Sequence, residues 1–158
     1  LTEFAAAMGL TSLDAMPDII AVNRRNADEY QHQFSQLPGC SIARDESTYP
    51  QNYQYIVVEI DAERCGLTRN ELVAVLQLEG VLARKYFSPG CHAHEPYRSL
   101  NPEAGRDLPL TEALCQRVLV LPNGPRVTLA LIEQITTLIR QALTQADAVR
   151  QALSGRTL

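Results

Sequence analysis

The chain has 158 residues, of which 46% are hydrophobic and 20% are charged, and its formal net charge is −4. These values are typical of an ordinary soluble globular protein with one domain. The basic residues are scattered, no uninterrupted apolar run approaches the roughly 18 residues needed to cross a bilayer, and the N-terminus lacks a basic stretch followed by an apolar one. We therefore expect no nucleic-acid partner, no membrane association and no signal peptide.

Two helical patterns open the chain. Residues 2–13 read as a helix that Thr2 caps. Pro17 is expected to break this helix and to start a second, amphipathic one that ends at residues 37–39. The apolar positions of the second helix recur at a spacing near 3.6 residues. They are Ile20, Ala27, Tyr30, Phe34 and Leu37.

Three strand-like segments follow, at residues 40–44, 53–60 and 81–87. The second is the clearest because it is rich in aromatic and β-branched residues, and a turn-like stretch at 45–52 precedes it. Between the second and third segments, Thr68 and Glu71 fit the capping box that starts a helix, and Gly80 suits its end because glycine tolerates positive φ.

A loop rich in histidine, tyrosine and arginine occupies residues 84–98, and no regular element is expected before a short helix capped by Thr111. A brief apolar strand at 119–122 and a long final helix capped by Thr128 complete the pattern. Strands that alternate with helices predict an α/β two-layer sandwich. Its sheet would be small, three- or four-stranded and largely antiparallel, and helices would cover it.

The four cysteines lie far apart without a C-x-x-C pair, which fits neither a zinc site nor a disulfide framework. We expect reduced thiols. Cys91 beside His92 suggests a nucleophile and its base, but adjacent residues on an extended loop point apart. His92 and His94 lack a third ligand, so we expect no metal site. Lys85 is the only lysine in the chain.

Five short motifs, in this order, resemble the C-terminal part of the DegT/DnrJ/EryC1/StrS aminotransferases, which are sugar aminotransferases of fold type I. They span the whole chain, and each is weak alone, so the resemblance depends on their order and separations. The motifs are residues 1–10 (LTEFAAAMGL), 52–58 (NYQYIVV), 84–92 (RKYFSPGCH, followed by PY at 96–97), 108–112 (LPLTE) and 119–124 (LVLPNG).

The resemblance implies an enzyme that uses pyridoxal 5'-phosphate to move an amino group from an amino acid, usually glutamate, to a keto sugar carried on a nucleotide. It also implies that residues 1–16 form an interdomain helix and residues 17–158 the small C-terminal domain of a cytoplasmic homodimer. The large N-terminal domain, which carries the Schiff-base lysine in this family, would be a missing partner. Lys85 lies within a strand pattern and has none of that lysine's surroundings, so we expect no catalytic or cofactor-binding residue in this chain and no activity from it alone.

Three loop residues are our candidates for contact with the nucleotide sugar. His92 matches the family's loop histidine and would bind the sugar nucleotide, or it would simply stabilise the loop. Tyr86 would shape the pocket wall, or pack in the core. Arg98 would neutralise a diphosphate, or remain a solvated surface charge.

Three other functions stay open at this point. The chain would be a binding module without catalysis, a dimerising module that uses the apolar face from Phe4 to Leu10, or part of a dehydratase of the same family. The sequence does not name the sugar, the ring carbon or the nucleotide.

Overall fold

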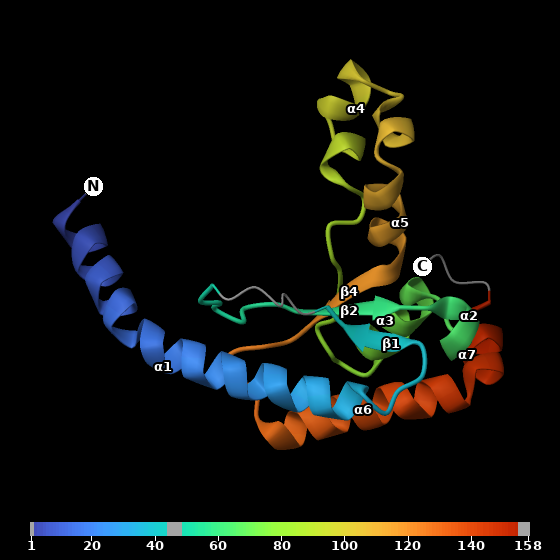
Figure 1. Ribbon diagram of the computed structural model, residues 1–158, viewed down its shortest axis with the longest axis horizontal. Coiled ribbons are helices and arrows are strands. Elements are labelled where there is room, and N and C mark those ends of the chain that lie inside the picture. The colour runs from blue at the N-terminus through green and yellow to red at the C-terminus, as the bar shows by residue number, and fades with distance from the viewer. Residues whose placement is uncertain (1, 44–48, 155–158) are drawn as a thin grey trace.

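The computed structural model describes residues 2–43 and 49–154, so Leu1, Arg44 and much of the predicted turn at 45–52 lie outside the described residues. Helices and strands alternate along the chain, as Figure 1 shows. The α-helices and strands are α1 (Glu3–Phe34), β1 (Cys40–Ile42), β2 (Ile56–Ile60), α2 (Ala62–Cys65), α3 (Arg69–Leu78), β3 (Arg84–Lys85), α4 (Tyr97–Leu100), α5 (Pro109–Arg117), β4 (Val118–Leu121), α6 (Leu129–Thr144) and α7 (Ala146–Leu153); the short 3-10 turns are η1 (Cys91–Ala93) and η2 (Ala104–Asp107).

The first helix is a single continuous element, so the predicted break at Pro17 is wrong. Thr2 caps it as expected by accepting a hydrogen bond from the backbone N–H of Ala5, and it runs through Pro17 to Phe34 (Figure 1). Proline removes one helical hydrogen bond and crowds the preceding turn. The helix around Pro17 is exposed to solvent, and water there can bond the freed carbonyl group, which makes an uninterrupted helix tolerable.

The same helix is relevant to the expectation that the chain does not associate with a membrane. Among the described residues, α1 is the one helix that is long and apolar enough to span a bilayer, because an 18-residue window reaches a mean hydropathy of 1.3 with none of it buried. Helix α1 contains no uninterrupted apolar run of that length, so it reaches this value only as an average over the window. The finding is weak evidence, since helices of soluble proteins and signal sequences pass the same test.

The sheet has four strands in the order β1-β2-β4-β3, and every neighbouring pair is antiparallel. The predicted fold class is confirmed. Burial alternates along β2, where Ile56, Val58 and Ile60 are buried and the residues between them are half-exposed. This period of two means that one face of the sheet is covered and the other is open.

Helices α1, α3 and α6 supply the side chains that cover the buried face. Tyr30 and Phe34 of α1, Leu72 of α3 and Ile139 of α6 belong to one core cluster with the inward residues of β2 and β4. Helices α1 and α6 lie side by side beneath the sheet (Figure 1). The capping box of Thr68 and Glu71 is present, as predicted.

Several predicted boundaries shift for local reasons. The strand predicted at 53–60 begins only at Ile56, and Tyr53 takes a φ of 51°, outside the extended region. The strand predicted at 81–87 shrinks to Arg84–Lys85. Thr111 does not cap the next helix: that helix begins at Pro109, a residue suited to a first turn because its φ is fixed and it needs no N–H partner there.

Candidate functional site

The segment from residue 86 to residue 117, here called the projecting segment, stands away from the sheet (Figure 1). It leaves β3 and returns to β4, two strands that are paired to each other. Contrary to the sequence prediction, it contains the short turns η1, α4 and η2 before α5. Its two ends are therefore fixed by the sheet, while its tip extends away from the rest of the domain.

His92 and Glu112 join the two limbs of the projecting segment. The Nε2 atom of His92, in η1, lies 2.6 Å from Oε1 of Glu112, in α5. The His92 side chain is 13% exposed and that of Glu112 is 44% exposed. A hydrogen bond this short to a carboxylate is charge-assisted when the imidazole is protonated. One ring nitrogen of His92 is thus hydrogen-bonded to the side chain of Glu112.

Gly90 makes room for this pair, and Gly105 lies in ordinary contact distance of it. A Cβ atom at Gly90 would lie only 2.7 Å from Cε1 and 2.9 Å from Nδ1 of His92, so the imidazole packs directly on the glycine backbone. Gly105 lies on the other side, where a Cβ would be 3.8 Å from Nε2. The position of the His92 ring is therefore set by close backbone contact as well as by Glu112.

A buried arginine anchors the base of the projecting segment. Arg69, at the start of α3, is 2% exposed. Its guanidinium donates to the carbonyl oxygens of Val118 and Cys115, each at 2.6 Å, and to Oγ of Ser88 at 3.2 Å. Burial lowers the pKa of Arg69, and the nearby Cys115 opposes that shift. The carbonyl of Cys115 belongs to the last turn of α5, so a positive charge there also suits the helix dipole.

An aromatic cluster lies where the projecting segment leaves the sheet. The ring of Tyr86 is 5.2 Å from that of Tyr55 and 4.0 Å from that of Phe87, measured between centroids. Phe87 has a φ of 45°, which is rare for a bulky residue, and its carbonyl oxygen accepts a hydrogen bond from the Cys115 thiol. Tyr55 and Phe87 are 54% and 65% exposed, so the cluster offers aromatic faces to solvent rather than to the core.

Arg98 lies in α4, at the outer end of the projecting segment (Figure 1). Its guanidinium bonds Glu95 through Nε at 2.9 Å and Nη2 at 2.6 Å. Hydrogen bonds from Ser99 and Arg98 lower the pKa of the Glu95 carboxyl, which keeps the partner charge in place. The three predicted contact residues thus occupy the base, the middle and the tip of one segment: Tyr86, His92 and Arg98.

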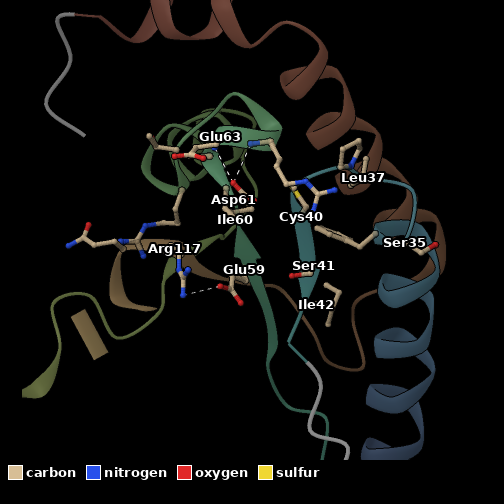
Figure 2. A pocket seen from close by; sticks show the side chains of 18 of the residues that line it. Ser35, Leu37, Cys40, Ser41, Ile42, Glu59, Ile60, Asp61, Glu63 and Arg117 are labelled. Carbon is tan, nitrogen blue, oxygen red and sulfur yellow. Dashed lines mark hydrogen bonds and ion pairs between the residues drawn. The ribbon is translucent and has the colours of Figure 1, made fainter. Parts of the chain in front are cut away.

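A cavity of about 1140 Å³ lies elsewhere in the described structure (Figure 2). It is bounded by the C-terminal end of α1, by β1 and the end of β2, by α2 and by the start of α3. Arg117, on its rim, pairs with Glu59 at 3.2 Å, and the Asp61 carboxylate caps α2. The described residues that line this cavity do not include any of the three predicted contact residues.

The only lysine is placed on a strand. Lys85 pairs with Leu119 of β4, and because paired residues share a face, its side chain starts on the covered side of the sheet. No group of three or more histidine, cysteine, aspartate or glutamate side chains within the described part of the chain is arranged to hold a metal ion. The described residues therefore offer neither a metal centre nor a lysine set in a cleft.

Comparison with known proteins decides the family. The profile of the DegT/DnrJ/EryC1/StrS aminotransferase family matches residues 1–140. The chain belongs to this family. The fold agrees: the structure of DesI in the presence of its TDP-sugar product superposes with a TM-score of 0.85 at 42% identity, over 96% of this chain and 38% of DesI.

More distant solved structures share the fold alone. DesV of S. venezuelae, in complex with a ketimine intermediate, has a TM-score of 0.76 at 21% identity, over 87% of this chain and 35% of DesV. A GDP-4-keto-6-deoxymannose-3-dehydratase with a trapped PLP-glutamate geminal diamine has a TM-score of 0.67 at 18% identity, over 84% of this chain and 34% of its own. The chain therefore spans between one third and two fifths of the length of these enzymes.

Two residues of the site escaped the sequence prediction. Glu112 stood in the LPLTE motif without an assigned role, and its separation of 20 residues from His92 gives no periodic clue. Arg69 was included only in the helix start between Thr68 and Glu71, although an arginine at the first turn of a capped helix runs against the dipole preference for acids there. That mismatch was the one available indication of a special role.

Proposed function

We propose that this chain is the C-terminal part of a pyridoxal phosphate-dependent aminotransferase that moves an amino group from an amino acid, glutamate being our choice, to a keto sugar linked to a nucleotide. The observation that carries the proposal is the likeness to DesI over 96% of this chain at 42% identity, in a structure that contains a TDP-sugar. The cofactor supplies the electron sink, and the protein supplies binding and orientation.

The described residues do not themselves fit the cofactor. A pyridoxal enzyme needs a lysine amine that reaches the aldehyde carbon, and Lys85 is a strand residue that pairs with Leu119. We propose that pyridoxal phosphate is held by a large N-terminal domain of the complete protein, and no chemical step is assigned to residues of this chain.

We further propose that the projecting segment contacts the nucleotide sugar. His92, oriented by Glu112, would contact the substrate through the exposed part of its ring, and the exposed aromatic rings at the base would flank it. Arg98 at the tip would contact the diphosphate, for which a guanidinium is well suited. Because Arg98 pairs with Glu95, it would have to release the Glu95 carboxylate in order to bind the diphosphate.

A chimera with DesI tests this proposal. The matching stretch of DesI is replaced by this chain, and two quantities are measured: the absorbance of bound pyridoxal phosphate and the amination of a TDP-linked keto sugar with glutamate as donor. We expect both to be retained. A chimera that folds and binds pyridoxal phosphate, yet dehydrates the sugar or leaves it unchanged while DesI aminates it, would contradict the proposal.

Variants within the active chimera test the role of His92. We expect His92→Ala to lower kcat/KM for the sugar roughly tenfold or more, the cost of one hydrogen bond to a charged group. His94→Ala is the matched control because His94 is exposed two residues away, and it should have no effect. Equal effects of the two variants would argue against substrate contact by His92.

A second candidate function is self-association through α1, and a specific observation favours it. Apolar side chains on the first half of α1 are strongly exposed, including Phe4 (78%) and Leu10 (64%). We propose that this face is covered in a cytoplasmic homodimer or by the large domain. Light scattering compares the wild type with Phe4→Asp: a concentration-dependent dimer that this substitution dissociates supports self-association, and two strict monomers remove it.

A further inference from the structure

Two cysteines far apart in the sequence lie next to each other in the fold. Cys40 is the first residue of β1 and pairs with Ile60 of β2, while Cys65 is the last residue of α2, which follows β2 directly. Both side chains are buried members of the hydrophobic core, with exposed fractions of 6% and 7%. Both are free thiols.

The backbone contacts show how close the two segments approach. Gly39 has a φ of 75°, and a Cβ atom on it would lie 2.7 Å from the amide nitrogen and 2.9 Å from the Cβ atom of Cys65. The amide of Asp61 donates to the carbonyl oxygen of Gly39 at 2.8 Å. Glycine is therefore required at position 39, since any side chain would collide with the cysteine of α2. The residue that precedes Cys40 is pressed against Cys65.

The chemistry of the two sulfur atoms differs. The Cys65 thiol donates to the carbonyl oxygen of Leu67 at 3.2 Å. Burial, together with the charge and hydrogen bonding of Cys65, raises the pKa of Cys40 to about 12. Cys40 consequently keeps its proton at neutral pH, which makes it a poor nucleophile toward an oxidant. Cys40 also lines the large cavity, and Figure 2 shows it at the edge of that cavity beside Ile60 and Asp61.

We propose that Cys40 and Cys65 form an oxidisable dithiol, a modification site that closes to an intramolecular disulfide between β1 and α2. With hydrogen peroxide as the oxidant, the Cys65 thiolate attacks one peroxide oxygen and the O–O bond breaks, which gives a sulfenic acid and hydroxide. The Cys40 sulfur then attacks the Cys65 sulfur and displaces its oxygen, and the Cys40 proton leaves with that oxygen as water. Two thiols and one peroxide thus give one disulfide and two waters.

The disulfide would act on the fold next to the cavity. It would tie the first residue of β1 to the last residue of α2, and it would close a loop of roughly 25 residues. Such a link restricts the unfolded chain, so oxidation should raise the unfolding temperature of this chain by about 5–10 °C. A thiol reductant should reverse the change.

Peptide mapping of the full chain tests this inference. Folded protein at low concentration is treated with hydrogen peroxide, its remaining thiols are alkylated, and it is digested with trypsin without reductant. Each cysteine falls in its own tryptic peptide, because arginine or lysine separates all four. We expect a disulfide-linked pair of peptides 26–44 and 65–69, loss of two hydrogen atoms from the intact mass, and the rise in unfolding temperature.

Cysteine variants test which residues form the link. Cys91→Ser should leave the linked pair unchanged, because Cys91 is exposed and belongs to another segment. Cys40→Ala should abolish the link and leave Cys65 as a higher oxide. If Cys40 and Cys65 are alkylated in the wild type while Cys91 is oxidised or links two chains, the inference is wrong. This outcome is read from wild-type protein, so it does not depend on whether a core variant folds.

Discussion

Substitution of Arg69 by methionine offers the strongest test of how the projecting segment is held. Methionine has a similar length and fills the same buried space, but it donates no hydrogen bond. The substitution leaves the carbonyl oxygens of Cys115 and Val118 without the donor that now lies 2.6 Å from each, and it also removes the contact to Ser88. Because Arg69 is 2% exposed, water does not readily replace the guanidinium.

The expected cost follows from these contacts. A buried polar group that loses its partner costs about 1–3 kcal/mol, and breaking a buried charged network about 3–5 kcal/mol. Two carbonyl groups lose their hydrogen-bond donor, and the Ser88 hydroxyl loses one of its partners. Removal of the buried positive charge offsets some of this loss of stability, because burying a charge is itself unfavourable. We expect Arg69→Met to lower the free energy of unfolding by about 3–4 kcal/mol.

Urea unfolding followed by circular dichroism gives that free energy. Arg64→Met is the matched control, since Arg64 is an exposed arginine in the neighbouring helix α2, and it should change stability by no more than about 0.5 kcal/mol. Limited proteolysis should also show faster cleavage within residues 88–117 for Arg69→Met. A loss below about 1 kcal/mol, or equal behaviour of the two variants, would refute the view that Arg69 anchors this segment.

Three further predictions concern single contacts. In a double-mutant cycle, His92→Ala and Glu112→Ala should show a coupling energy of about 1–2 kcal/mol for their 2.6 Å hydrogen bond, and additive unfolding free energies would contradict it. Thr68→Ala should destabilise the chain by about 1 kcal/mol through loss of the capping box, whereas Thr144→Ala, at a site that caps no helix start, should be near neutral in the same urea assay. The free energy of unfolding should fall as pH rises from about 9 toward 12, because the unfolded chain ionises Cys40 at its ordinary pKa of 9.0 while the folded chain keeps the proton until a pKa of about 12. Urea unfolding in the presence of reductant across this pH range should show a flatter profile for Cys40→Ala than for the wild type. Identical profiles for the two proteins would contradict the assignment.

The sequence by itself determined the main helices and strands and the threonine caps that start three of the helices. Hydrophobic spacing and local capping act over a few residues, so they can be recognised in the sequence without a tertiary structure. The capping box at Thr68, the cap at Thr128 and the positive φ of Gly80 all appear where the pattern placed them. The small antiparallel sheet and the family also follow from the order of the motifs.

Only the tertiary structure decided which polar residues are buried and which partners they meet. Asn26 follows two arginines in the amphipathic helix, yet it is fully buried and donates to the carbonyl oxygen of Val127, 101 residues away. The pair of His92 and Glu112 and the pair of Cys40 and Cys65 likewise depend on how the chain returns upon itself. Such contacts have no sequence period, because their geometry is set by the packing of whole elements.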